Sequence, residues 1–470
     1  MDRFIVWLRQ DLRLEDNPAL YEASKKGVII PIYILDDTHP KQFKMGSASL
    51  YWLKNLLHSL NQDCDQLLRT YKGDPIIILP KLIEEFNAKG VLWNRCYEPW
   101  RIQRDRKIKE MLSSFHIESF NASLLWEPWQ ILKSDQTPYR VFTPYYRKGC
   151  LPSEHQPRDP LPKVSPKSFL EKQPFEKNEP IDITMKVDWG EKLISHWDIG
   201  EKGGHQRLNH FIEQGLSDYK VGRDFPGGHH TSRISVDLHW GTLSPHQVRN
   251  AVMSHPPSES KNLDHYLSEL GWREFSYYLL YHFPYLPTDN LQKKFDYFPW
   301  IEDETTLKRW QMGQTGFPIV DAGMREMYAT GYMHNRLRMV VGSFLVKNLL
   351  QHWHAGEAWF WDCLVDADLA SNSAGWQWIA GCGADAAPYF RIFNPITQGE
   401  KFDAQGTYTR KWVPELKDLP NQYLFKPWEA PSDVLSNANI ILGKTYPKPI
   451  VSVSESRARA LQAFEKLKGI

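Results

Sequence analysis

A run of hydroxyl side chains with one arginine follows a glycine-containing loop. The run consists of Thr231, Ser232, Arg233, Ile234 and Ser235. Hydroxyls, backbone N–H groups and a guanidinium that meet where a helix begins can hold a diphosphate. Thr and Ser also cap helices when no ligand is present. The segment therefore predicts either a diphosphate cradle or an ordinary helix N-terminus.

Glu269, Trp272 and Arg273 have the i, i+3, i+4 spacing that places side chains on one face of a helix. A carboxylate beside a flat ring can hydrogen-bond the edge of a nucleobase while the ring stacks on it. The same three residues would also make a salt-bridged surface edge with a half-buried Trp. The spacing alone leaves both interpretations open.

The segment M-H-N-R-L-R-M from Met333 to Met339 concentrates polar groups at one expected helix start. Every charged residue between positions 331 and 347 is positive. Such a patch could contact phosphates, although solvated surface charge gives the same pattern.

Asp366 and Asp368 form a D-x-D pair, with Asn372 one turn further along the chain. A divalent-metal loop is one interpretation of this pair. The surrounding sequence is rich in Trp, Phe, Leu and Val, so buried carboxylates here need cationic or amide partners. A heterocycle with ring N–H donors satisfies that need, and we expect no metal site.

Aromatic residues make up 13% of the chain, with 19 Trp, 21 Tyr and 22 Phe. Five of the tryptophans fall between positions 353 and 378. Clustered indoles fill cores, form stacking platforms and provide electron routes, and composition does not separate these roles.

The elements that position these groups differ between the two parts of the chain. Residues 4–8, 28–35, 76–79 and 91–93 read as buried strands, and helical spacing between them predicts a Rossmann-like parallel sheet with crossover helices. We assign this α/β domain to residues 1–130. It lacks G-x-G-x-x-G and G-x-x-x-x-G-K, so the common nucleotide fingerprints are missing.

A proline-rich stretch separates the two parts, with seven prolines between positions 151 and 180. We assign residues 131–200 to an interdomain linker and residues 201–470 to an all-α domain. Long helices are expected at 263–283, 319–330 and 335–353. Pro318 suits the first turn of the second helix, and Gly331 its C-cap.

The overall composition fits a globular protein of 470 residues. Lys and Arg number 57 against 56 Asp and Glu, so the net charge of +1 excludes a globally basic nucleic-acid binder. Five cysteines without C-x-x-C spacing indicate neither a disulfide framework nor a zinc site. Since a strand-like run begins at once after Met1, we expect no signal peptide and a cytoplasmic location.

Six motifs together resemble the photolyase and cryptochrome family, most closely the class I cyclobutane pyrimidine dimer photolyases. They are T-S-R-I-S at Thr231, S-E-L-G-W-R-E-F at Ser268, M-H-N-R-L-R-M at Met333, D-A-D-L-A-S-N at Asp366, G-W-Q-W at Gly375 and P-Y-F-R-I-F-N-P at Pro388. The similarity begins with W-L-R-Q-D-L-R-L-E-D-N-P-A-L at Trp7 and extends to T-Q-G-E-K-F-D at Thr397. Independent motifs in one order make chance a poor explanation.

This resemblance implies an FAD held by the helical domain. Tyr219 and residues 231–235 would hold the phosphates, and Asp366, Ala367 and Asp368 would face the flavin and ribose, with Arg338 paired to Asp366. Asn372 falls at the position that faces flavin N5, where photolyases carry Asn. Tyr266 and Tyr332 depart from the Trp common in relatives but remain aromatic.

The resemblance also implies light-dependent repair, in which excited reduced FAD lends an electron to a flipped-out dimer and recovers it. Glu269 and Asn372 would act in catalysis, with Glu269 also touching the cofactor. An electron relay would consist of Trp376, Trp353 and Trp300. The residues expected to contact the lesion or DNA are Arg223, Glu269, Trp272, Arg273, Asn335, Arg336, Met339, Trp378 and Gln398.

A second, antenna chromophore is implied for the α/β domain, either a folate such as methenyltetrahydrofolate or a deazaflavin. Met45 and Glu98 lie where relatives hold it, and we favour the folate. The expected partner is damaged DNA, bound by a monomer that associates with the nucleoid.

Three alternatives stay open. A cryptochrome photoreceptor would share the fold without repairing DNA, although Asn372 and the short C-terminus argue against it. A six-four photolyase would present two histidines at the lesion, whereas only His334 stands here. A nucleotide-binding module that does not respond to light would lack a flavin spectrum.

Overall fold

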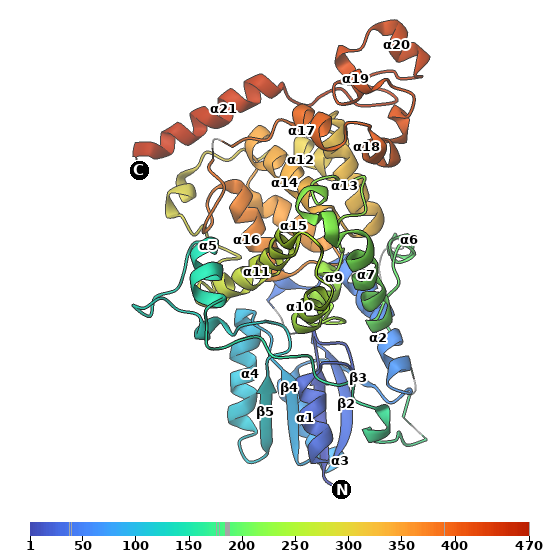
Figure 1. Cartoon of the computed structure of the whole chain (residues 1–470), viewed down its shortest axis with the longest axis vertical. Helices are drawn as coiled ribbons and strands as arrows, with labels where there is room; N and C mark the ends of the chain where they lie inside the picture. The colour runs from blue at the N-terminus through green and yellow to red at the C-terminus, as the bar shows by residue number, and fades with distance from the viewer. Residues whose placement is uncertain are drawn as a thin grey trace. The chain divides into compact units, whose positions relative to one another are not determined.

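The computed structural model describes residues 1–36, 38, 40–174, 176–177, 179–183, 189–389 and 391–469. The chain divides into two compact units (Figure 1). One consists of residues 1–217 and 232–284, and the other of residues 218–231 and 285–470. The predicted boundaries at 130 and 200 are not those of the compact units and stay a prediction. The predicted linker includes the undescribed positions 175, 178 and 184–188.

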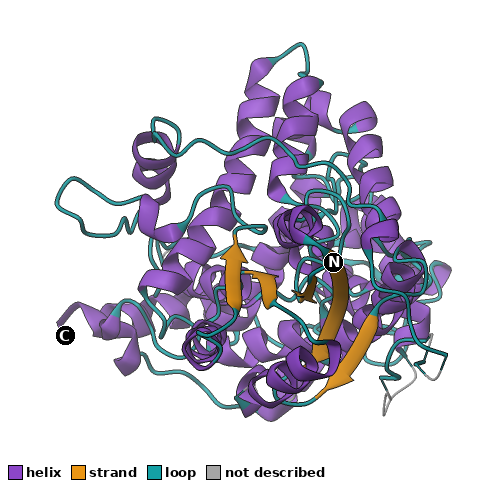
Figure 2. Ribbon diagram, turned by 90° about the horizontal axis from the view of Figure 1, so that it is seen from below, coloured by secondary structure: helices purple, strands orange, loops and turns teal. Residues whose placement is uncertain are grey.

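The first unit contains a five-stranded, fully parallel sheet in the order β3-β2-β1-β4-β5. Its strands are β1 (Arg3–Leu8), β2 (Val28–Leu35), β3 (Arg69–Lys72), β4 (Gly90–Asn94) and β5 (His116–Phe120). Figure 2 shows these strands in orange within a chain that is otherwise mostly helical. The central strands are buried on both faces, which explains their unbroken apolar sequences.

Helices cover this sheet and extend the unit. They are α1 (Pro18–Lys26), α2 (Ser47–Asp63), α3 (Pro75–Phe86), α4 (Pro99–Met111), α5 (Phe142–Pro144), α6 (Gly190–Ile194), α7 (Glu201–Gln214), α9 (Ser235–Trp240), α10 (Pro245–Ser254) and α11 (Ser260–His282). Side chains of α3 and α4 pack with Ile5, Trp7 and Trp93 in one apolar cluster.

The second unit is all-helical, as predicted. It contains α8 (Tyr219–Gly222), α12 (Glu304–Gln311), α13 (Pro318–Thr330), α14 (Asn335–Ser343), α15 (Trp353–Cys363), α16 (Leu369–Ala380), α17 (Pro395–Phe402), α18 (Thr407–Trp412), α19 (Asn421–Leu424), α20 (Ser432–Asn437) and α21 (Val453–Glu465). Its core is a large apolar cluster that includes Trp310, Trp353 and Trp376. No helix in the described ranges is both long and apolar enough to cross a bilayer.

The fold class is confirmed, with two local corrections. Residues 76–79 are not a strand but the first turn of α3, because the Asp74 side chain accepts a hydrogen bond from Ile76 N at 2.9 Å and Pro75 occupies the first helical position. The third strand is instead β3. The second correction concerns the helix expected at 335–353, which is interrupted.

That interruption separates α14 from α15. After Ser343 the chain makes a π-helical turn over Phe344–Asn348, and Leu350 then adopts a left-handed φ of 55°. The next helix begins at Trp353, where the His352 side chain accepts a hydrogen bond from His354 N. No Gly or Pro lies between Ser343 and Trp353, and apolar residues continue through the break, so periodicity could not show it. Gly331 and Pro318 take their predicted cap positions.

Candidate functional site

In the helical unit, a buried ion pair joins two of the expected cofactor residues. Arg338 Nη2 of α14 lies 2.7 Å from Asp366 Oδ2, in the turn between α15 and α16. Asp366 is only 7% exposed, and Arg338 Nε also donates to the Met333 carbonyl. The pairing predicted for the first carboxylate of the D-x-D is therefore present.

The second carboxylate of the D-x-D has a different role. Asp368 is the N-cap of α16, and its Oδ1 accepts a hydrogen bond from Ser371 N at 2.7 Å. Ala367 between the two acids is buried. The motif thus places one carboxylate against a guanidinium and uses the next to start the helix that carries Asn372.

Asn372 lies beside a partly buried acid, Glu357, that sequence reasoning missed. Asn372 Nδ2 donates to the Glu357 backbone carbonyl at 3.0 Å, and Ser373 Oγ donates to Glu357 Oε1 at 2.5 Å. Burial raises the pKa of the Glu357 carboxyl to about 8, against a lowering by the Ser373 hydrogen bond. Glu357 is therefore protonated at neutral pH. Its only signal in the sequence is an acid within the aromatic run from Trp353 to Trp361.

The three expected relay tryptophans belong to the same apolar cluster or pack against it. Trp376 packs against Gly356 of α15, so closely that a Cβ there would lie 2.1 Å from the indole. Trp353, three residues before Gly356, is fully buried and donates Nε1–H to Asn290 Oδ1 at 2.9 Å. The His352 ring lies 5.1 Å from the Trp300 ring and 5.7 Å from the Trp353 ring.

Part of the expected DNA face also lies within this unit. Arg336 pairs with Asp224 at 2.5 Å, and Asn335 beside it is exposed. His334 caps α14 by accepting the Arg336 N–H, and burial lowers its pKa to about 3.

The other expected DNA contacts of this unit lie on several elements. Gln398 lies on α17. Met339 and Trp378 are partly buried against the apolar cluster, and Arg223 follows α8 with its guanidinium 5.4 Å from the Tyr219 ring.

The remaining expected residues of the lesion face belong to α11 in the other unit. Trp272 stacks on Phe142 with ring centroids 3.9 Å apart at 15°. Glu269, on the same helix, is half-buried. Arg273 donates to the Ser123 carbonyl at 2.7 Å and pairs with Glu274 at 3.2 Å, so its guanidinium anchors the segment after β5.

The hydroxyl-rich run is divided between the units, with Tyr219 and Thr231 in the helical unit and 232–235 in the other. Tyr266 is buried, and its hydroxyl lies 3.4 Å from Ser232 Oγ. Arg233 adopts a left-handed φ of 55°. The N-cap of α9 is Ile234, without a side-chain hydrogen bond, so the ordinary Ser or Thr cap of our alternative does not form at this helix.

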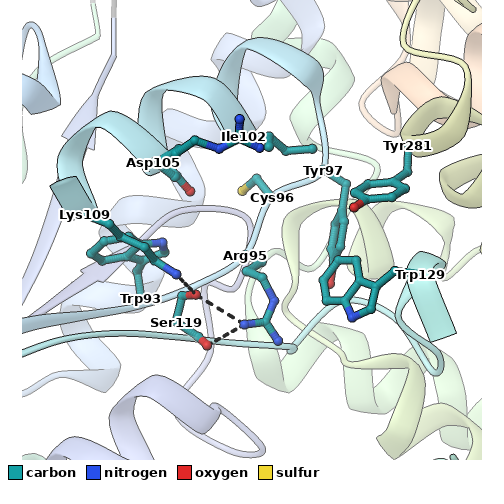
Figure 3. A pocket seen from close by; sticks show the side chains of 11 residues that line it. Trp93, Arg95, Cys96, Tyr97, Ile102, Asp105, Lys109, Ser119, Trp129 and Tyr281 are labelled. Atoms are coloured by element: carbon teal, nitrogen blue, oxygen red, sulfur yellow. Dashed lines mark hydrogen bonds between the residues drawn. The ribbon is translucent and has the colours of Figure 1, made fainter.

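A pocket of about 240 Å³ opens at the carboxyl ends of β4 and β5 (Figure 3). Trp93 and Trp129 contribute indole surfaces to its wall. Arg95 and Lys109 both hydrogen-bond Ser119, at 2.5 and 2.7 Å. Ligands of open parallel sheets bind at this end of the strands. Neither Met45 nor Glu98, our expected antenna residues, lines this pocket.

Comparison with known proteins covers both units. The family model described as the FAD binding domain of DNA photolyase matches residues 266–466, and the DNA photolyase model matches residues 4–166. A deoxyribodipyrimidine photo-lyase of Agrobacterium fabrum is 44% identical over 99% of this chain and 98% of its own. The chain belongs to the photolyase and cryptochrome family.

Other members of this family agree over almost the whole chain. Cryptochrome-1 of Arabidopsis thaliana is 36% identical over 98% of this chain and 70% of its own. A class III photolyase from Agrobacterium tumefaciens superposes with a TM-score of 0.92 at 42% identity, covering 100% of this chain and 98% of its own. That relative is a class III photolyase, whereas our expectation named class I.

The residues present in this photolyase-family chain fit FAD. A buried carboxylate held by one guanidinium can accept a hydrogen bond from a ring N–H, as Asp366 beside Arg338 would. Two hydroxyls and an arginine, in Ser232, Arg233 and Ser235, suit the charge and acceptors of a diphosphate. This donor set matches the two chemically distinct parts of the cofactor.

Proposed function

We propose that this chain repairs cyclobutane pyrimidine dimers in DNA in a light-dependent reaction with FAD, as a deoxyribodipyrimidine photo-lyase. The observation that carries the proposal is the neutral environment around Asn372. Its Nδ2 is engaged by the Glu357 carbonyl, so the amide presents Oδ1 as an acceptor. A neutral amide beside a protonated Glu357 carries no negative charge. Unlike an ionised acid, it therefore does not repel a reduced anionic flavin.

When bound, reduced FAD supplies the excited-state electron that opens the cyclobutane ring and takes that electron back. The protein supplies position and electrostatics. Asp366, oriented by Arg338, would hold the flavin ring, and Tyr219 with residues 231–235 would hold the diphosphate. Tyr266 and Asp368 would line the same site.

Several of the expected side chains would contact the lesion itself. Trp272, which stacks on Phe142, would also stack on an extruded pyrimidine, since aromatic faces bind bases of any sequence. Glu269 would hydrogen-bond the pyrimidine edge and steady charge that develops on its carbonyl region. Arg336 and Arg223 would contact phosphates, and Asn335, Met339, Trp378, Arg273 and Gln398 would complete the surface.

Trp376, Trp353 and Trp300 would carry electrons that reduce oxidised flavin. Trp353 Nε1 donates to Asn290, an amide that cannot take up the indole proton. An oxidised Trp353 would therefore keep its proton and pass the electron vacancy onward. Repair itself would not need this route.

The pocket at β4 and β5 would hold the antenna chromophore, and we favour a folate. A pteridine would pack on indole surfaces, and the cations Arg95 and Lys109 suit its glutamate carboxylates. Purified protein given methenyltetrahydrofolate should retain its near-ultraviolet absorbance through gel filtration, and Lys109→Glu should lose it. Retention of a deazaflavin instead would replace the folate assignment.

Light-dependent loss of dimers from irradiated DNA tests the central proposal. Purified holoprotein with reduced flavin should remove dimers under blue light and leave them in the dark. A protein that carries flavin yet removes no dimers would contradict the proposal and leave the cryptochrome-type photoreceptor and the six-four photolyase as the alternatives. Within this proposal a monomer acts in the cytoplasm and associates with the nucleoid during repair.

A further inference from the structure

The phosphate-contacting arginine of the proposed lesion face already has an anionic partner. Arg336 is the second residue of α14, and Asp224 follows α8, 112 residues earlier. Arg336 Nη2 lies 2.5 Å from Asp224 Oδ1, and both residues belong to the helical unit. Their side chains are 17% and 34% exposed, so incoming DNA can reach the pair.

An aromatic surface fixes the guanidinium in this position. Its central carbon lies 4.4 Å from the centroid of the Phe402 ring, at the end of α17. The Phe225 ring, next to Asp224, packs edge-on against the same Phe402 ring at 6.1 Å. The segment that carries Asp224 and the helix that carries Phe402 thus hold Arg336 from two sides.

We propose that Asp224 limits the affinity for DNA by competing with the DNA backbone for Arg336. This inference rests on the proposed function. A carboxylate and a phosphate are alternative acceptors for the same guanidinium donors. A phosphate gains the Arg336 contact only by displacing Asp224, whose freed carboxylate then repels that phosphate.

The competition lowers the affinity for damaged and for undamaged DNA, and the remaining contacts decide which of them still binds. A duplex with a dimer gains further contacts when the lesion is extruded, and these offset the displacement. An undamaged backbone offers only phosphates, so it bears the same displacement with nothing to offset it. Asp224 should therefore suppress binding along undamaged DNA.

Asp224→Asn removes the competing charge and keeps the size of the side chain. Since exposed ion pairs are weak, we expect undamaged duplex to bind about two- to five-fold more tightly. The slope of log affinity against log salt should become steeper by about 0.9, as one more phosphate is neutralised without a competitor. Dimer-containing duplex meets the same displacement and should gain by a similar factor, so absolute binding to undamaged DNA should rise while the ratio of the two affinities changes little.

A matched control removes the same charge from the same segment. Asp218 is exposed and makes no side-chain cap for α8, so Asp218→Asn alters net charge equally and leaves the Arg336 pair in place. Arg336→Gln gives the second control, because Asp224→Asn should have no further effect in that background. Melting temperature and flavin absorbance of each holoprotein establish that the variants fold.

Fluorescence anisotropy in the dark, over a salt series, decides the proposal. Competition is supported if Asp224→Asn binds undamaged duplex more tightly than Asp218→Asn does, and if this gain disappears in the Arg336→Gln background. Weaker binding by Asp224→Asn would mean that Asp224 positions Arg336 for DNA. Equal effects of the two variants would mean that only the net charge of the protein matters. Either result overturns the proposal. Wild-type protein with no preference for dimer DNA would overturn the proposed function itself.

Discussion

Burial decides which side chains near Asn372 are charged. Glu357 lies on α15, between Trp353 and Trp361, and burial is the main cause of its raised pKa of about 8. In the unfolded chain a Glu titrates near 4.3. Between these two values the unfolded state has lost the proton that the folded state keeps.

Glu357→Gln should therefore change how stability depends on pH. Because the folded pKa is raised, the stability of the wild type is greatest below about pH 4.3 and falls as pH rises to about 8. For each pH unit between the two pKa values, the free energy of unfolding falls by at most about 1.4 kcal/mol. The variant, which does not ionise there, should lack this fall. Denaturant unfolding of both proteins at a series of pH values measures the difference.

Ser373→Ala gives the companion experiment, since the Ser373 hydrogen bond lowers the pKa of Glu357. Its loss should extend the fall in stability to higher pH. Parallel pH profiles for wild type and Glu357→Gln would show that Glu357 is ionised in the folded protein.

Truncation of Glu269 and truncation of Arg336 should impair different properties, the repair yield and the DNA affinity respectively. Glu269→Ala should lower repair per absorbed photon more than DNA affinity, because its carboxylate acts on charge that develops in the reaction. Arg336→Ala should mainly weaken DNA binding. Repair yield at saturating DNA, measured beside the dissociation constant, separates the two effects. Equal loss of affinity with normal yield in both variants would contradict this division of roles.

Trp300→Phe tests the outer end of the proposed electron route. The variant should keep FAD and repair dimers normally when supplied with reduced flavin, but light-driven reduction of oxidised flavin by an external thiol should fail. FAD content, repair and photoreduction are measured on one preparation. Unchanged photoreduction would exclude Trp300 as an obligatory relay, and joint loss of FAD and repair would indicate a packing role.

At the scale of elements, α15 and α16 approach each other through a glycine. A Cβ at Gly356 would lie 2.1 Å from the six-membered ring of Trp376, whereas one at Gly375 of α16 would meet nothing within 4 Å. The two sites are therefore a matched pair of helical glycines in one helix pair.

Gly356→Ala should destabilise the protein by about 1 to 3 kcal/mol, because the rigid indole of Trp376 must move. Gly375→Ala should stabilise it by up to about 1 kcal/mol through helix propensity. Thermal melting of both variants gives the comparison. Similar effects of the two substitutions would show that the interface adapts without cost.

Sequence patterns predicted these elements where local chemistry was distinctive. Buried β-branched runs identified β1, β2 and β4, and Gly331 identified the end of α13. The strand predicted at residues 76–79 was wrong because a short apolar run is equally compatible with a buried helix. The break near Leu350 depends on a left-handed backbone that no residue type announced.

The candidate site was predictable only in part, for a related reason. Asp366 needed a cationic partner in apolar surroundings, and Arg338 is found there. Glu357 was missed because helical spacing does not show that its carboxyl is buried against Ser373. The Asp224–Arg336 pair joins residues 112 positions apart, a separation over which a single sequence carries no pairing signal.

For the whole molecule, a net charge of +1 limits how DNA can be held. Binding must depend on a local patch, so dimer DNA should be released by salt with a slope of only about −2 to −4, at about −0.9 per phosphate neutralised. Undamaged duplex should bind weakly at physiological salt. Anisotropy titrations across salt concentrations give the slope, and a slope near zero would remove phosphate contacts from the account.

The most direct test counts repaired dimers against flavin redox change in the same sample. Holoprotein with fully reduced flavin is mixed with an excess of a dimer-containing oligonucleotide, kept without oxygen and exposed to measured light. We predict many dimers opened per protein in the light, none in the dark, and an unchanged flavin spectrum at the end. No dimer loss in the light, or flavin oxidised in step with dimer loss, would contradict repair by an electron that is lent and returned.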